Sequence, residues 1–160
     1  MPIPSLNDYR KNQGRKAKAF GDLFESMFKY TCHKLGIAIT VIPPGCKSMG
    51  GTRIIRVKSP FDWICTYQGK TALIDTKTCI GNAFPHSQIS DHQIHELVHH
   101  QISGAIAGYV IWLRKSDRII FLDALTLEKR AQKPGSINDE LPEARSLGNG
   151  KSFDPTQMFI

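Results

Sequence analysis

Two aspartates and a lysine near the middle of the chain have the types and spacing to hold a cation against a phosphodiester. Gln68-Gly69 is typical of a two-residue hairpin turn, because glycine supplies the positive φ that such a turn needs. Counting outward from this turn sets Asp62 opposite Asp75. Side chains alternate along a strand, so Lys77 projects on the same face as Asp75. The spacing therefore predicts two carboxylates and an ammonium group at the open end of one hairpin.

This cluster would be unfavourable without a counterion. Directly opposed residues of an antiparallel pair have Cβ atoms about 4.5 to 5.5 Å apart, and like charges at that distance repel. Asp62 and Asp75 thus offer two hard oxygen ligands suited to Mg²⁺, with Mn²⁺ as a substitute. Lys77 would orient an attacking water or steady negative charge on phosphate. The alternative is a hairpin whose end carries an Asp/Lys salt bridge and a solvated aspartate.

The elements that must position these groups follow from the apolar patterning. Residues 16–35 carry apolar side chains at three- and four-residue steps, which predicts an amphipathic helix. β-Branched and alternating segments predict strands at 37–42, 53–58, 62–67, 70–77, 109–113 and 118–122. The segment 43–51 is rich in proline and glycine and is expected to be a loop.

Two shorter helices complete the expected order. Ser90 and Gln93 have the spacing of a capping box, which predicts a helix from there to about Ser103. A closing helix is expected at 124–132. The order of helices and strands indicates an α/β sandwich with a mixed central sheet flanked by helices. We expect a flexible basic arm at 1–15, a single domain at 16–133 and a poorly packed extension at 134–160.

The charge balance points to a polyanionic partner. The chain of 160 residues carries 21 Lys and Arg against 14 Asp and Glu, a formal net charge of +7. We expect two groups of basic residues to contact DNA phosphates, one in the arm and one around the predicted loop: Arg10, Lys11, Arg15 and Lys16, then Lys47, Arg53, Arg56 and Lys58. Neutralising the arm should weaken DNA binding and flatten its salt dependence.

Several short motifs together resemble a known family. Ser59-Pro60-Phe61-Asp62 followed by Asp75-Thr76-Lys77 resembles the PD-(D/E)xK signature of restriction-enzyme-like nucleases. The order of further segments resembles the RecU-like Holliday junction resolvases from about Gly21 to Leu127; these segments are Gly21 to Glu25, Phe84-Pro85, His92-Gln93-Ile94 and the strand pair at 109–122.

The resemblance implies a restriction-endonuclease-like fold and a homodimeric, Mg²⁺-dependent enzyme that nicks four-way DNA junctions symmetrically. It also implies roles for individual residues: Glu25 would complete the acidic cluster, Asp62, Asp75 and the Thr76 backbone carbonyl would bind metal, and Gln93 would lie at the edge of the site. The chain has Asp75 where the family usually has Glu, and the insert at 42–58, where the family carries a projecting stalk, is short.

Two alternatives remain open. His95-Glu96-Leu97-Val98-His99 fits the HExxH pattern of zinc metalloproteases, but His100 is the last histidine and no later one can serve as third ligand. The second alternative is a DNA-binding module without catalysis, in which the acidic pair is structural.

The cysteines and the hydropathy indicate an expected compartment. Cys32, Cys46, Cys65 and Cys79 show no CxxC spacing, and no apolar segment near the start resembles an export signal. No apolar run approaches the roughly 20 residues needed to cross a bilayer. We expect a cytoplasmic protein with free thiols and no membrane partner. Whether the substrate is a junction, a fork or a flap is left open by these residues.

Overall fold

A computed structural model describes residues 6–48, 50–52 and 54–160, with the side chains of residues 6–10 excepted. Its centre is a mixed sheet of six strands in the order β1-β4-β5-β7-β8-β10. All neighbours in it are antiparallel except β5 and β7, which are parallel. The strands are β1 (Ala38–Val41), β4 (Trp63–Tyr67), β5 (Lys70–Cys79), β7 (Ile106–Leu113), β8 (Arg118–Asp123) and β10 (Arg145–Gly148).

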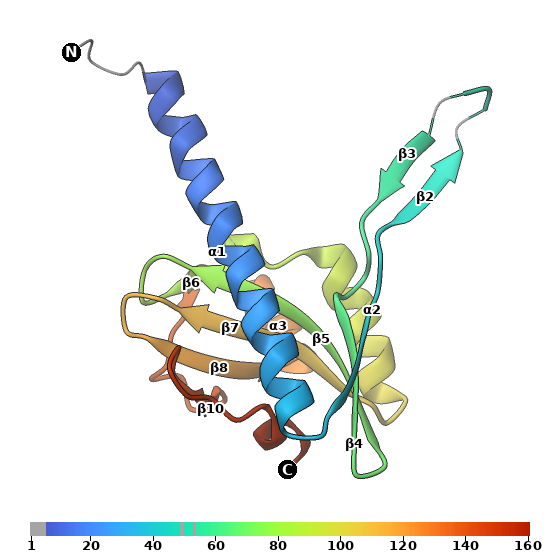
Figure 1. Ribbon diagram of the computed structural model, residues 1–160, viewed down its shortest axis with the longest axis vertical. Coiled ribbons are helices and arrows are strands. Elements are labelled where there is room, and N and C mark those ends of the chain that lie inside the picture. The colour runs from blue at the N-terminus through green and yellow to red at the C-terminus, as the bar shows by residue number, and fades with distance from the viewer. Residues whose placement is uncertain (1–5, 49, 53) are drawn as a thin grey trace.

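Helices cover both faces of this sheet. Helix α1 (Leu6–Lys34) crosses one face, and Phe24, Phe28 and Cys32 on its inner side are buried in a core with the sheet. Helices α2 (Asp91–Ile102) and α3 (Ala124–Ala131) pack together over the other face, behind the sheet in Figure 1. The parallel pair β5 and β7 requires a crossover, and α2 supplies it. The expected α/β architecture with a helix-flanked mixed sheet is confirmed.

The first helix is longer than expected. It begins at Leu6 rather than near Lys16, so the expected flexible arm is wrong for residues 6–15, which are helical. Residues 1–5 lie outside the described part. Residues 6–15 mix good helix formers (two Arg, one Lys, one Gln and one Leu) with poorer ones (two Asn, one Asp and one Gly), so local composition does not predict this part of the helix. Figure 1 shows this half of α1 projecting from the body, and Lys11–Ala19 are all exposed.

The expectation of a poorly packed extension at 134–160 is also wrong. Strand β9 (Ser136–Ile137) pairs with β6 (Phe84–Pro85), and β10 pairs with β8 at an edge of the central sheet. The 3-10 helix η2 (Pro155–Phe159) then brings Met158 and Phe159 into the core beneath α1, together with Phe153. The apolar residues of this segment are widely spaced, and their partners lie far away in sequence, so local periodicity does not reveal them. A second short 3-10 helix, η1 (His86–Gln88), precedes α2.

The predicted loop at 43–51 is in part a strand. β2 (Gly45–Ser48) pairs with β3 (Ile54–Val57) as a two-stranded hairpin, and every residue of both strands is exposed. Figure 1 shows this hairpin standing out from the body, on the same side as the free half of α1. Prolines and glycines mark its base and its tip, which made the whole segment appear irregular.

No helix in the described part of the chain is long and apolar enough to cross a membrane. All four cysteines are free thiols.

Candidate metal centre and nucleic-acid interface

The hairpin formed by β4 and β5 has the predicted turn and register. Gln68 and Gly69 both have positive φ, 49° and 78°, as a tight two-residue turn requires. From there Ile64 pairs with Leu73 and Trp63 pairs with Ile74. The strand register predicted from the sequence is therefore confirmed from the pair Tyr67 and Lys70 to the pair Trp63 and Ile74.

The sheet has a notch directly beyond that last pair. β4 begins at Trp63, whereas β5 continues to Cys79, so the far half of β5 has no neighbour from β4. The Asp62 N–H still donates to the Ile74 carbonyl at 3.0 Å. Asp62 Oδ2 accepts from the Thr76 backbone N–H at 3.0 Å and from the Thr76 hydroxyl at 3.2 Å. The Asp62 carboxylate is thereby fixed beside residues 75 and 76.

The Thr76 backbone carbonyl opens into the same notch. In an extended strand, the N–H and the carbonyl of one residue point toward the same edge. The Thr76 N–H faces Asp62 at the uncovered edge. The Thr76 carbonyl therefore points toward the notch, where none of the described strands pairs with this part of β5.

Asp75 is a fully buried carboxylate at the centre of this arrangement. Burial raises its pKa to about 7; the nearby Lys77 ammonium lowers it, and the Asp62 carboxylate raises it further. Lys77 forms an ion pair with Asp75 Oδ2. Oδ2 has no hydrogen bond among the described residues. Asp62, Asp75 and Lys77 thus meet in one environment, as the spacing predicted.

Gln93 on α2 connects the carboxylate to the lysine. Its Nε2 donates to Asp75 Oδ1 at 2.7 Å, and its Oε1 accepts from Lys77 Nζ at 3.3 Å. The side chain is 1% exposed, and Ser90 makes no capping hydrogen bond through its side chain. The predicted helix exists, but the predicted capping box is wrong, because the Gln93 amide bonds to the buried Asp75 instead.

Tyr109 on β7 is a site residue that sequence reasoning missed. Its hydroxyl donates to Gln93 Oε1 at 3.3 Å and accepts from the Ser90 N–H at 3.4 Å. Lys77 Nζ lies 5.1 Å from the centre of its ring. Burial raises the pKa of the Tyr109 hydroxyl, and Asp75 raises it further, so the group stays a donor. Tyr109 pairs with Asp75 across the parallel β5/β7 register, which local sequence does not reveal.

Glu25 reaches the rim of the site from α1. Burial raises the pKa of its carboxyl, and the negative charge of Asp62 raises it further, while Lys77 lowers it. In the described part of the chain, however, no three His, Cys, Asp or Glu side chains are close enough to hold one metal ion. Glu25 therefore adds negative charge near Asp62. The resemblance implied three acidic ligands, Glu25, Asp62 and Asp75, and the structure does not bring these three together around one metal position.

The groups present fit a small divalent cation. Asp75 Oδ2 is buried with Lys77 as its ion-pair partner, Asp62 lies beside it, and the Thr76 carbonyl points to the same notch. Mg²⁺ binds through one or two carboxylates and keeps several waters for the remaining positions. A cation there would also offset the burial of Asp75 and its repulsion by Asp62, which together raise the pKa of Asp75.

Comparison with known proteins now identifies the family. The family model RecU, Recombination protein U, matches residues 23–142, which is most of the chain. The chain belongs to the RecU family. The resemblance stated from its motifs is therefore confirmed, and the matched segment includes Glu25, Asp62, Asp75, Lys77 and Gln93. No curated protein matches the sequence.

A solved structure shows the same fold. The chain is similar to Hjc of Archaeoglobus fulgidus, a Holliday junction resolvase from an archaeal hyperthermophile. The two are 19% identical with a TM-score of 0.56, and the match covers 79% of this chain and 95% of that one. The likeness supports a resolvase-type fold for this RecU-family chain.

The predicted DNA-contacting residues lie on the two projecting elements of this RecU-family chain. Lys11, Arg15 and Lys16 are exposed on the free half of α1. The exposed residues Lys47, Arg56 and Lys58 lie on or beside the β2–β3 hairpin. Arg53 and the side chain of Arg10 lie outside the described residues.

The HExxH segment of this RecU-family chain lies apart from the Asp75 site. His95 and His99 are exposed on α2 with ring centroids 4.6 Å apart. The part of the chain that the structure describes adds no third ligand to them. The zinc protease alternative therefore lacks a complete metal site in these residues.

Proposed function

We propose that this RecU-family chain is a divalent-metal-dependent endonuclease of the PD-(D/E)xK class that resolves Holliday junctions by nicking phosphodiester bonds. The observation that carries the proposal is the notch at the end of β4, where Asp62, Asp75 and Lys77 meet around the Thr76 carbonyl. Membership of the RecU family and the fold shared with an archaeal resolvase support it. Mg²⁺ is the proposed cation, with Mn²⁺ as a substitute.

Each group in the notch has a task in hydrolysis. A divalent cation held by Asp62, Asp75 and the Thr76 carbonyl would polarise the scissile phosphate and lower the pKa of a water. Lys77 is one-fifth exposed, so its ammonium can reach that water or the phosphate oxygens while it stays paired with Asp75. The water gives up a proton to solvent as it adds to phosphorus, the bond to the 3′ oxygen breaks, and that oxygen takes a proton from solvent.

Gln93 and Tyr109 keep the site rigid. With its Oε1 accepting from Tyr109 and Lys77, the Gln93 amide must direct its Nε2 toward Asp75. The carboxylate is thus held with Oδ1 occupied and Oδ2 directed at Lys77 and the notch. Both side chains are buried, so neither touches DNA.

The exposed basic residues give the DNA a path to this notch. Lys11, Lys18 and Glu25 are seven residues apart, two helical turns each, so they follow one line along α1. This line leads from the projecting half of α1 to the rim of the site. The β2–β3 hairpin stands on the same side of the molecule and carries Lys47 and Arg56. A duplex arm would lie between the two projections, with its backbone at the notch.

The remaining partners follow from the chemistry of resolution. Symmetric resolution needs a nick in each of two strands, and the described residues of one chain form one such notch. We therefore propose that the chain acts as a homodimer on a four-way junction, rather than on a fork or a flap. We place it in the cytoplasm, where its four free thiols would stay reduced.

A cleavage assay with defined substrates tests the proposal. The protein is incubated with a four-way junction, a fork, a flap and a linear duplex, each with Mg²⁺, Mn²⁺ or EDTA. We expect symmetric nicks in the junction with either metal and none with EDTA. Binding of all substrates without any nicking would instead show the non-catalytic DNA-binding module.

A second assay addresses the HExxH alternative. The double variant His95→Ala/His99→Ala removes both imidazoles of the HExxH segment and leaves Asp75 in place. We expect junction nicking by this variant to equal that of the wild type, with no casein proteolysis by either protein. Proteolysis that disappears in the variant would contradict the nuclease assignment.

A further inference from the structure

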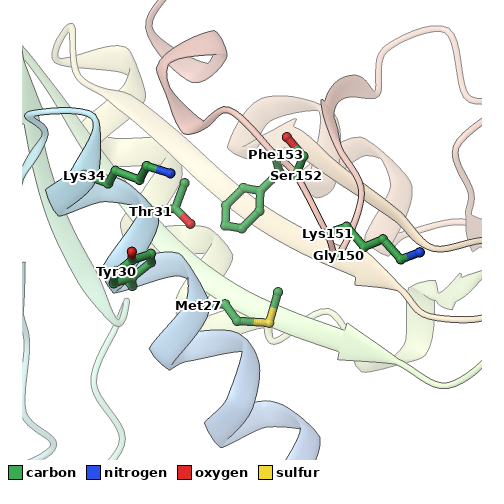
Figure 2. A pocket seen from close by; sticks show the side chains of 8 residues that line it. All are labelled: Met27, Tyr30, Thr31, Lys34, Gly150, Lys151, Ser152 and Phe153. Carbon is green, nitrogen blue, oxygen red and sulfur yellow. The ribbon is translucent and has the colours of Figure 1, made fainter.

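A groove runs along α1 on the side away from the catalytic notch. It is a cavity of about 300 Å³ between the second half of α1 and the segment 150–153. Met27 and Phe153 provide apolar surface, and Lys34 and Lys151 lie on opposite walls. Figure 2 shows Tyr30 and Lys34 on α1 and Lys151 on the facing segment. Tyr30 is 69% exposed, so its ring is open to a ligand.

The helix geometry separates this groove from the notch. Met27 and Lys34 are seven residues apart and follow one line along α1. Glu25 precedes Met27 by two residues, which places it about 200° around the helix at roughly 100° per residue. Glu25 is electrostatically coupled to Asp62 and Lys77, and so marks the flank that faces the notch. The groove is therefore on the other flank, with the body of α1 between the two.

Positive charge extends beyond the groove along this flank. Lys16 is exposed on the same line as Lys34, eighteen residues or five turns earlier. The Arg114 guanidinium lies 3.3 Å from the centre of the Phe20 ring and 4.8 Å from that of Trp112. Trp112 in turn lies against Gly150 at the groove. Among the described residues Arg114 makes no ion pair, and the nearby Asp117 carboxylate instead accepts from Trp112 Nε1 and from the Gly150 N–H.

The lining chemistry favours a nucleic-acid backbone. As far as the structure describes this groove, its lining has two lysines, the hydroxyls of Thr31 and Ser152, and no carboxylate. The adjoining hollow includes Asp154, but that carboxylate already accepts hydrogen bonds from Thr156 and Gln157. Lysines that follow a backbone and an open aromatic ring on which a base can stack are the features of single-strand binding surfaces.

A second copy of the chain fits this groove poorly. In a two-fold symmetric contact the same patch meets itself. Lys34 and Lys151 of one copy would face the same lysines of the other, with no carboxylate in the lining to pair with them.

We infer that this flank of α1 is a second DNA-binding surface, which holds the sugar-phosphate backbone of a further strand of the branched substrate, with a base against Tyr30. The inference rests on the proposed function, because it assigns the surface to another strand of the same substrate. It differs from the path proposed above, which follows the opposite flank of α1.

Binding measurements without divalent metal test the surface apart from the chemistry. Lys34→Ala with Lys151→Ala is compared with Lys129→Ala and Lys133→Ala, which remove the same charge from exposed positions around α3. The Kd for a four-way junction, for a single strand and for a linear duplex is measured in EDTA between 50 and 200 mM salt, a range over which phosphate contacts lose roughly 10³- to 10⁵-fold in affinity when six to ten are made.

For the Lys34/Lys151 variant, we expect a weaker junction Kd and a slope of log K against log salt that is smaller by about 1.4 to 1.8, as for two lost phosphate contacts. The control should keep the wild-type Kd and slope. Tyr30→Ala should weaken single-strand and junction binding while leaving the slope unchanged, since the ring carries no charge.

Three results would overturn the inference. The first is a Lys34/Lys151 variant with the Kd and slope of the control. The second is an equal loss in the control, which would indicate a general effect of net charge. The third is unchanged DNA binding with an altered sedimentation mass, which would assign the groove to a second copy. Absence of nicking in the metal assay would count against the proposed enzyme activity. The binding measurements in EDTA would still test this surface, because they do not depend on cleavage.

Discussion

The molecule contains two hairpins of opposite character. In the β4–β5 hairpin half of the residues of β5 are buried, the register is fixed by core packing, and the end carries Asp75 and Lys77. In the β2–β3 hairpin every residue of the two strands is exposed, and Figure 1 shows the hairpin standing out from the body. Reacting groups need fixed positions, whereas groups that follow a flexible phosphate backbone need reach. The contrast fits the proposed roles, with chemistry at the first hairpin and substrate binding at the second.

The largest effect should come from the buried hairpin. Asp75→Asn keeps the shape of the side chain but removes a ligand charge, and Lys77→Ala removes the ammonium beside it. We expect each to lower junction nicking by roughly 10²- to 10³-fold or more, in line with the loss of one preorganised electrostatic contact. Junction binding in EDTA should persist in both variants.

Matched controls separate chemistry from folding. Asp139→Asn makes the same substitution at a partly exposed aspartate that lies 3.8 Å from Arg118, and Lys129→Ala removes an exposed lysine on α3. Both should retain wild-type nicking. If Asp75→Asn or Lys77→Ala kept full activity, the roles assigned to the notch would be wrong.

The exposed hairpin should give a smaller effect of a different kind. Lys47→Ala, Arg56→Ala and Lys58→Ala together should weaken junction binding, and the salt slope should fall by about 2 to 3 for three lost phosphate contacts. All three side chains are exposed, so the free energy of unfolding should change by only about 0.5 kcal/mol or less for each substitution. The rate of nicking at saturating junction reports whether the chemistry is untouched.

This comparison would fail if the triple variant bound DNA normally or unfolded at much lower denaturant. The first result would remove the hairpin from the DNA path. The second would show that its side chains pack on the body, contrary to their exposure.

The two hairpins also show what the sequence could and could not reveal. The β4–β5 register follows from one local signal, the Gln68-Gly69 turn, and this is why Asp62, Asp75 and Lys77 could be placed together. β2 was missed because prolines and glycines at its base and tip hide four paired residues. Local signals suffice where a tight turn fixes the pairing, and fail where pairing depends on distant contacts.

Tertiary contacts explain the other misses. The capping spacing of Ser90 and Gln93 is real, but the buried Asp75 competes for the Gln93 amide and takes it. Tyr109 depends on a parallel register set by the crossover through α2, which single-sequence patterns do not specify. Leu147, Phe153 and Phe159 fill a core beneath α1 that becomes visible only once β10 pairs with β8.

The smallest predicted effect is a pH dependence of stability that belongs to the buried hairpin alone. Asp75 has a folded pKa raised from 3.8 to about 7, chiefly by burial. Below about pH 4 both folded and unfolded chains hold this proton. Between there and pH 7 the unfolded chain loses it first, so the folded state binds more protons and its stability falls as pH rises. Above pH 7 the loss is complete.

Thermal unfolding without metal isolates this contribution. The Tm of the wild type minus that of Asp75→Asn should fall as pH rises from 4 to 7 and then level off, since asparagine has no proton to lose. Added Mg²⁺ at pH 8 should raise the Tm of the wild type and have less effect on the variant, because a cation that binds only the folded state stabilises it. The Lys47/Arg56/Lys58 variant should keep the wild-type pH profile, because its charges are exposed in both states. A pH-independent difference between wild type and Asp75→Asn would mean that Asp75 is already ionised in the folded protein, with Lys77 alone offsetting its burial.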